Sequence, residues 1–378
     1  MQGKHRNPLK HVAAWIYREH VRQQLASLVR WTPLTDPQPG CTAIIGMCSR
    51  LPQVVDANLR CLIGARWPEL KRIVIAVDAT REVFPLDGQI LAAAHPGIDI
   101  KVVHYSARQS EFAERIKLPF VYCWLSWCLA LAEVNTREVL IHDYDALVFG
   151  DTLRRRHEEF VRSGAVMQGV SWYSGNGLWA EDRLATTFEA FVQMAWLRSL
   201  PPVSLFNKVG VKDGRSVDYD ITLCIQDRLL RPEQRTCIPM DLDELVHPSQ
   251  MIHQYTMFRK FPGQPLPCFS MPMLPLFALL SGQVDAFDRA TQSLRAGNRG
   301  AVDLAGDGTP MNLQQLNMPH IDWTLKQMIQ AVLMLGLPAN PSLLRYGQAL
   351  YDHVGVAKEQ RHGDFTPRQR EWIQMSTA

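Results

Sequence analysis

The sequence lacks the features that would place it in several common protein classes. It has eight cysteines, but they form no Cys-x-x-Cys pair and no His/Cys cluster at zinc-finger spacing. Its most apolar stretch, residues 268–282, is shorter than the roughly 20 residues of a membrane helix and contains prolines. Residues 1–30 carry charges throughout, without the apolar run of a secretory signal. We therefore expect a cytoplasmic protein with reduced cysteines, no structural zinc and no transmembrane segment.

The sequence also has little excess charge of either sign, and it has no internal repeat. Its formal net charge is +3, and its Lys and Arg residues are scattered rather than gathered into one stripe. This distribution argues against a nucleic-acid partner. Hydrophobic residues make up 47% of the chain and charged residues 20%, which is ordinary globular usage. A chain of 378 residues is long enough for one large α/β domain or two modest domains.

Near the N-terminus, residues 10–31 have apolar positions at helical spacing, with basic residues on the polar side. Such a helix suits peripheral contact with the anionic inner face of a membrane. The alternative is a surface helix that packs on the rest of the protein.

Strand-like and helix-like segments alternate from residue 41 onward. Short apolar or β-branched runs at 41–49, 71–80, 98–106 and 138–149 predict strands, and helical patterns lie at 53–67, 86–94 and 119–134. This order predicts an α/β fold with a mostly parallel sheet flanked by helices. Ligands bind at the carboxyl ends of the strands in such sheets.

The pattern changes after residue 164. We expect a strand and a Gly-rich turn, a helix near 181–199, a loop near 200–216 and a helical C-terminal extension. The predicted domains are an N-terminal helix and linker at 1–39, a catalytic domain at 40–265 and the extension at 266–378. Within the catalytic domain, residues 40–150 form the nucleotide-binding half and residues 151–265 the acceptor half.

The segment "VLIHDYDALVF", residues 139–149, places Asp143 and Asp145 in an apolar strand. Side chains two residues apart in an extended segment share a face, whereas Tyr144 points the opposite way and receives no chemical role. Two buried carboxylates repel each other unless a cation or a proton compensates them. Oxygen ligands of this kind suit Mn²⁺ or Mg²⁺. The alternative is a strand-end turn in which each carboxylate caps a backbone N–H.

In this context, "LIHDYDALVF" resembles the D-x-D segment of nucleotide-sugar-dependent glycosyltransferases of the GT-A fold. The resemblance covers roughly residues 40–262 and implies a Rossmann-like fold and a hexosyltransferase activity. It implies that Asp145 binds the metal and that Asp143 contacts the metal or the ribose. A late histidine completes the metal site in many members, and His253 fits that place better than His247.

The resemblance also implies a donor site. Residues at the ends of the first two strands would hold the nucleotide, and a carboxylate that accepts from a uracil N–H favours a UDP-sugar. The alternative for Asp78 is a loop cap, and an exposed solubilising charge is the alternative for Lys117. The implied donor contacts are Cys48, Ser49, Arg50, Asp78, Lys117, Arg259 and Lys260.

The segment "SWYSGNGLWA" would line the sugar and acceptor pocket. Glycines let a backbone approach a ligand closely, and a Trp face packs on a sugar ring. A plain β-turn with two core tryptophans is the alternative. The residues concerned are Trp172, Gly175, Asn176, Gly177 and Trp179.

A second acid-aromatic-acid pattern, "SVDYDITL", precedes a predicted helix. In inverting members an acidic residue at such a helix start is the general base, and Asp220 fits this place better than Asp218. An N-terminal helix cap is the alternative for one of the two. The acceptor is a hydroxyl on a glycan, lipid or small molecule.

Two further functions stay open. The strand also resembles that of haloacid-dehalogenase-like phosphatases, in which Asp143 would be the nucleophile and Asp145 the acid. Ala146 and Leu147 depart from the Gly and Thr usual there. A non-catalytic nucleotide-sugar binding protein is the other alternative.

Overall fold

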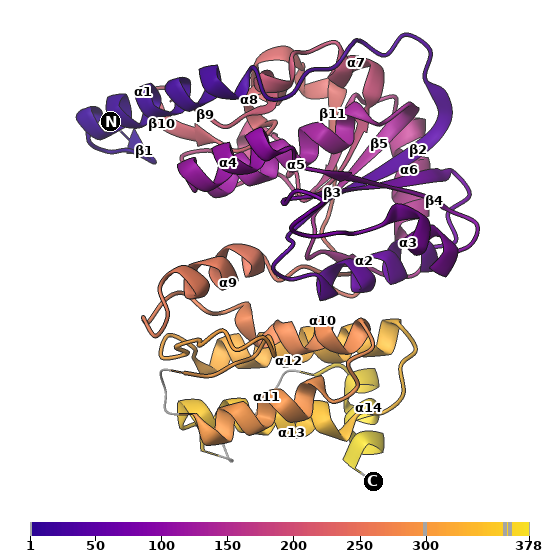
Figure 1. The fold of residues 1–378 in the computed structure, drawn as a ribbon, viewed down its shortest axis with the longest axis vertical. Helices are drawn as coiled ribbons and strands as arrows, with labels where there is room; N and C mark the ends of the chain where they lie inside the picture. Colours follow the sequence, from indigo (N-terminus) through magenta and orange to yellow (C-terminus); the bar gives the residue numbers. More distant parts are fainter. Residues whose placement is uncertain (1, 298–300, 358–360, 362–364, 378) are drawn as a thin grey trace. The chain divides into compact units, whose positions relative to one another are not determined.

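The computed structural model describes residues 2–297, 301–357, 361 and 365–377. The chain forms two compact units (Figure 1). The first comprises residues 1–50, 66–144 and 153–240, and the second comprises residues 51–65, 145–152 and 241–378.

A seven-stranded sheet lies at the centre of the first unit. Its order is β11-β7-β8-β5-β2-β3-β4. The neighbours β4, β3, β2 and β5 are parallel, as are β11 and β7, whereas β8 runs antiparallel to both β5 and β7. The predicted mostly parallel sheet is thereby confirmed. The strands are β2 (Gln38–Met47), β3 (Leu70–Val77), β4 (Asp99–His104), β5 (Thr136–His142), β7 (Met167–Val170), β8 (Glu189–Gln193) and β11 (Arg235–Ile238).

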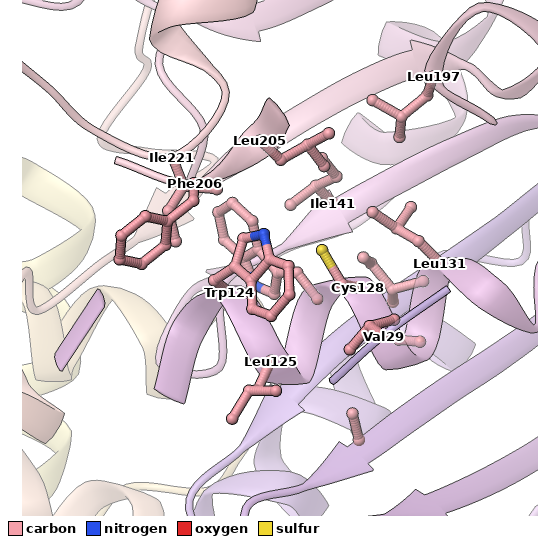
Figure 2. Close-up of a cluster of buried hydrophobic side chains, with 14 of the residues drawn as sticks. Val29, Trp124, Leu125, Cys128, Leu131, Ile141, Leu197, Leu205, Phe206 and Ile221 are labelled. Carbon is pink, nitrogen blue, oxygen red and sulfur yellow. The ribbon is translucent and has the colours of Figure 1, made fainter. Parts of the chain in front are cut away.

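Helices of the first unit flank this sheet, and α5 is buried against it. Trp124, Leu125, Cys128 and Leu131 of α5 face a cluster that includes Ile141 of β5 (Figure 2). The sequence of α5 is apolar on most sides of the helix, as expected for a helix that is buried in a core. The helices are α1 (Pro8–Leu25), α3 (Gly88–Ala94), α4 (Ala107–Ile116), α5 (Pro119–Ala132), α6 (Thr152–Ser163), α7 (Met194–Arg198) and α8 (Leu223–Leu229), with short 3₁₀ turns at 180–182, 202–205 and 232–234.

Two expectations for the middle of the chain are wrong. The helix predicted near 181–199 is instead strand β8 followed by the short helix α7. Residues 189–192 are all buried, so the side chains on both faces of β8 lie in the core and the sequence shows no strand alternation. The loop predicted near 200–216 contains β9 (Lys208–Lys212), which forms a hairpin with β10 (Arg215–Tyr219). The N-terminal β1 (Gln2–Gly3) pairs with β10.

The second unit is mainly helical, as predicted for the C-terminal extension. It also includes α2, which contacts α10, and a two-stranded sheet of β6 and β12. The helices are α2 (Gln53–Gly64), α9 (Met251–Lys260), α10 (Leu274–Leu280), α11 (Ala286–Ala296), α12 (Met318–Met334), α13 (Pro341–Val354) and α14 (Pro367–Thr377), with a 3₁₀ turn at 271–273; the strands are β6 (Leu147–Val148) and β12 (Leu245–Val246). Among the described residues, no helix is both long and apolar enough to span a membrane.

Candidate functional site

The two central aspartates lie in a turn that follows β5. The strand ends at His142, and the backbone N–H of Asp143 donates to the carbonyl of Phe188 at 2.7 Å. The N–H of Tyr144 donates to Asp143 Oδ1 at 3.1 Å. The expected extended geometry, with both carboxylates on one strand face, is therefore wrong. Asp145 is 4% exposed and Tyr144 is 2% exposed, so the turn is buried.

The pairing of β6 with β12 explains which histidine accompanies Asp145. Leu147 pairs antiparallel with Val246, so the residue after β12 lies beside the residues before β6. His247 Nε2 is consequently 3.4 Å from Asp145 Oδ1. On the other side, the Asn58 side chain of α2 donates to the carbonyl of Ala146 at 3.2 Å.

Asp143, Asp145 and His247 form a group with the composition of a metal site. Each offers one ligand atom, and these atoms lie within 4.8 Å of one another. Two carboxylates and an imidazole can together bind a divalent cation. The group contains both predicted aspartates, but its histidine is His247 and not the predicted His253. His253 is an exposed residue of α9.

Ser49 and Asp78 meet at the ends of β2 and β3, as the parallel order predicts. Met47 pairs with Val77, and the N–H of Ser49 donates to Asp78 Oδ1 at 2.7 Å. Burial raises the pKa of Asp78, whereas its hydrogen bonds from Ser49 and Cys48 and the charge of Arg50 oppose this shift. One oxygen of Asp78 thus caps the loop, in keeping with the simpler alternative.

The predicted basic donor contacts are surface residues. Arg50 forms an ion pair with Glu114 at 3.2 Å, and Lys117 is exposed at the C-terminus of α4. In the second unit, Arg259 lies 3.3 Å from Asp307, and Lys260 is exposed. Their donor-binding role stays a prediction.

The Gly-rich segment forms a two-residue turn that packs on β10. Asn176 and Gly177 both have positive φ, 53° and 87°, as in a type I′ turn. The N–H and C=O groups of Gly175 and Leu178 bond reciprocally at 3.0 and 2.8 Å. The Asn176 side chain bonds to Tyr173 and Lys4, each at 2.8 Å. The plain turn thus accounts for the conformation of these three residues, and their role in a sugar pocket stays a prediction.

Replacing Gly177 with alanine is expected to destabilise the protein by about 3 kcal/mol or more. The new Cβ would lie 2.2 Å from the Ser216 carbonyl oxygen, in addition to the cost of positive φ. Urea denaturation measures the loss. Gly164→Ala is the matched control, because Gly164 has φ +64° and open space around its Cβ position. Equal losses for the two variants would refute the packing explanation.

The two tryptophans of this segment contact arginines. Trp179 is 52% exposed, and the Arg215 guanidinium lies 3.8 Å from its ring centroid. Trp172 is half-buried, with the Arg183 guanidinium 5.4 Å from its ring centroid. One face of Trp179 is thus already used in a cation–π contact.

Asp220 lies between β10 and α8 as a buried carboxylate. Its Oδ1 accepts hydrogen bonds from the N–H of Ile221 at 2.7 Å and from the Asn207 amide at 3.2 Å. Burial raises the pKa of Asp220, and the carboxylates of Asp218 and Asp143 add to the increase. The helix-cap alternative does not describe Asp220, because the N-cap position of α8 is Thr222.

Asp218, the second predicted catalytic acid, faces a different partner. Its Oδ2 lies 3.4 Å from the Arg18 guanidinium of α1, and its N–H donates to the Asn176 carbonyl at 2.9 Å. These contacts anchor α1 and the Gly-rich turn to β10. Asp220 is therefore the better candidate for a general base.

Cys123 and Tyr173, which were not predicted as site residues, are affected by the charges of the aspartates. Burial raises the pKa of the Cys123 thiol, and the charges of Asp143 and Asp220 contribute. Burial also raises the pKa of Tyr173 to about 12, with Asp220 and Asp218 contributing. The charges of Asp143 and Asp220 both act on the thiol of Cys123, a residue of α5 in the first unit.

A buried hydrogen-bonded pair, His142 and Glu189, lies at the end of β5 next to this turn. His142 Nδ1 lies 2.5 Å from Glu189 Oε2, and both side chains are almost fully buried. Arg156 of α6 lies 4.0 Å from the other Glu189 oxygen. Because removal of one partner would leave a buried polar group without its hydrogen bond, this arrangement fixes the residue that precedes Asp143. This pair was not predicted, because Glu189 was expected in a helix.

Comparison with known proteins gives similarity of structure only. No family model and no curated protein sequence matches the chain. S. aureus TarS 1–349 is similar at a TM-score of 0.35 and 11% identity, over 83% of this chain and 89% of TarS 1–349. The mannosyltransferase PcManGT from Pyrobaculum calidifontis is similar at a TM-score of 0.33 and 14% identity, over 97% of this chain and 93% of its own. Mouse xyloside xylosyltransferase 1 is similar at a TM-score of 0.31 and 11% identity, over 53% of this chain and 85% of its own.

Proposed function

We propose that the protein is a metal-dependent glycosyltransferase that moves a sugar from a nucleoside diphosphate sugar to a hydroxyl acceptor. The observation that carries the proposal is the group of Asp143, Asp145 and His247, which begins where a central parallel strand ends. Open α/β sheets bind ligands at this edge. The proposal rests on these residues and not on the structural similarities.

The three side chains fit a divalent cation. Two carboxylates supply negative charge, and the imidazole favours Mn²⁺ over Mg²⁺. A cation held there would balance the charge of the donor diphosphate and of the leaving nucleoside diphosphate.

Asp220 supplies the base in this proposal. Its Oδ1 is held by Ile221 and Asn207, whereas its Oδ2 has no hydrogen-bond partner among the residues that the structure describes. That oxygen can accept the proton of an acceptor hydroxyl. The raised pKa makes Asp220 a stronger base than an ordinary carboxylate. This role corresponds to inversion at the sugar carbon, and retention would need another role for Asp220.

We propose a UDP-sugar as the favoured donor because Asp78 lies at the neighbouring strand end. One of its oxygens is bonded to Ser49, and the carboxylate can also accept from a uracil N–H. Cys48, Arg50, Lys117, Arg259 and Lys260 are proposed as further donor contacts. Eight free cysteines support a cytoplasmic location for the reaction.

The alternatives explain fewer of these residues. A two-aspartate phosphatase uses Asp143 and Asp145 but leaves His247 and the perturbed Asp220 without a role. A non-catalytic binding protein likewise has no use for a buried carboxylate of raised pKa.

A turnover assay tests the proposal. The protein is incubated with a panel of nucleoside diphosphate sugars, and release of the nucleoside diphosphate is measured with Mn²⁺ and with EDTA. Release that requires the metal is expected for one donor, by slow hydrolysis even without an acceptor. Phosphate release from simple phosphomonoesters that depends on Asp143 would instead support the phosphatase. Donor binding without turnover under any acceptor would support the binding protein.

Replacing His247 with alanine is expected to weaken Mn²⁺ binding by about tenfold or more, because one ligand is lost. Titration of Mn²⁺ followed by electron paramagnetic resonance measures this affinity. His253→Ala is the matched control and should bind Mn²⁺ like the wild type. A larger loss in His253→Ala than in His247→Ala would restore His253 as the ligand.

A further inference from the structure

Helix α1 has an inner face that is fixed to the first unit. Figure 1 shows α1 alongside β9 and β10. Arg18 contacts Asp218 at 3.4 Å, and His11 Nδ1 lies 2.8 Å from Ser216 Oγ. Val21 and Leu25 are fully buried. These contacts determine which side of the helix remains outside.

The outer face of α1 is apolar. Leu9, Val12 and Ile16 are spaced by three and four residues, so they form one stripe, and they are 79%, 47% and 56% exposed. Trp15 and Tyr17 lie on the two borders of this stripe, each 45% exposed. A contiguous exposed patch of this kind marks an interaction surface. We call these five residues the α1 outer face.

Basic residues lie at the N-terminal end of the α1 outer face. Lys4, Arg6 and Lys10 are exposed at its N-terminal end. The one acidic residue among residues 2–25 is Glu19, which pairs with Arg22 at 3.1 Å and with Lys208 at 3.9 Å. The net charge of this segment is therefore positive.

A shallow hollow continues the surface beside Trp15. Apolar and basic side chains share its lining, so it can receive an acyl chain end beneath a phosphate group. It is lined by His11, Val12, Trp15, Lys208, Val209, Gly210, Val211 and Arg228.

We propose that the α1 outer face binds the surface of an anionic lipid bilayer. Trp and Tyr at the borders of an apolar stripe suit the headgroup region of a bilayer. There the rings are partly buried and the indole N–H and phenol O–H groups stay hydrated. The stripe inserts into the upper acyl region, and the basic residues contact lipid phosphates. A protein partner would not require aromatic residues on both borders together with unopposed positive charge. The proposal does not depend on the glycosyltransferase reaction.

Vesicle flotation of the full-length protein tests this proposal. The vesicles are phosphatidylcholine alone, and phosphatidylcholine with about one third phosphatidylglycerol. The wild type should float with the anionic vesicles, and added salt should weaken the association. Val12→Ser with Ile16→Ser should lower the partition coefficient about tenfold or more. Lys10→Glu should weaken binding to the anionic vesicles only.

The matched control replaces two exposed apolar residues elsewhere in the first unit. Val83→Ser with Ile90→Ser changes side chains that are 76% and 71% exposed, and it should float like the wild type. Circular dichroism melts verify that both double variants are folded. Equal flotation of the two double variants, or no flotation of the wild type, would overturn the proposal. A wild-type dimer that Val12→Ser with Ile16→Ser converts to monomer would also overturn it, because a second copy would then occupy the face.

Discussion

Replacing Asp220 with asparagine is expected to lower kcat by about 10²–10⁴-fold, the usual contribution of a general base. Asparagine has the same shape, and its carbonyl oxygen can still accept from Ile221 and Asn207. Donor affinity should therefore change little, so the loss appears in kcat. Steady-state kinetics on the donor identified by the turnover assay measure both quantities. Asp36→Asn, an exposed carboxylate in the N-terminal linker, is the matched control.

The pH dependence of Asp220 has a defined sign. The base acts when deprotonated, so kcat/KM of the wild type should fall as the pH falls through the raised pKa of Asp220. This acid limb should be missing from the residual activity of Asp220→Asn. Near-normal activity of Asp220→Asn, with the acid limb intact, would show that another group is the base.

The same raised pKa predicts an effect on stability. The pKa is higher in the folded state than in the unfolded chain, so ionised Asp220 destabilises the fold above its folded pKa. The penalty disappears as the pH falls below the unfolded value. At neutral pH, Asp220→Asn should therefore unfold at an equal or higher temperature than the wild type. A lower melting temperature would indicate a structural role.

Replacing Asp145 with asparagine is expected to abolish metal-dependent donor turnover, with a loss of about 10²–10³-fold or more. The change removes the charge of a carboxylate that is 4% exposed and lies beside His247, but it keeps the side-chain volume. Mn²⁺ affinity and turnover should fall together. Added Mn²⁺ should partly restore turnover in His247→Ala, which keeps both carboxylates. Full turnover by Asp145→Asn in EDTA would remove the metal from the mechanism.

The sequence predicted the features that depend on repeated local patterns. The β-branched runs that became β2, β3 and β5 alternate with helices, and this order requires parallel neighbours. Ser49 and Asp78 therefore meet, because each follows a strand at the same sheet edge. The position of Asp143 after β5 follows from the same rule.

The features that the sequence did not predict depend on pairing between distant segments. The side chains on both faces of strand β8 are buried, so its residues lack the alternation that marks a half-buried strand. His247 reaches Asp145 through β6 and β12, which are only two residues each and too short to carry a periodic signal. The same limit applies to Cys123 and Tyr173, whose raised pKa values come from burial and from the carboxylates folded near them.

The Gly-rich segment shows that one motif is compatible with two roles, a turn in the fold and a contact with a sugar. Its glycines were expected to let the backbone approach a sugar. The structure uses Gly177 to bring the turn against the carbonyl of Ser216, and Asn176 to bond Tyr173 and Lys4. Positive φ at a turn and close approach to a ligand demand the same residue type.

The most direct test of the metal-dependent donor site is a calorimetric titration of UDP and of GDP into the protein, in Mn²⁺ and in EDTA. Wild-type protein should bind at least one of the two nucleotides in Mn²⁺ and neither in EDTA, and Asp145→Asn should bind neither in either buffer. Equal affinity of the wild type in Mn²⁺ and EDTA, or no binding of either nucleotide, would contradict the account.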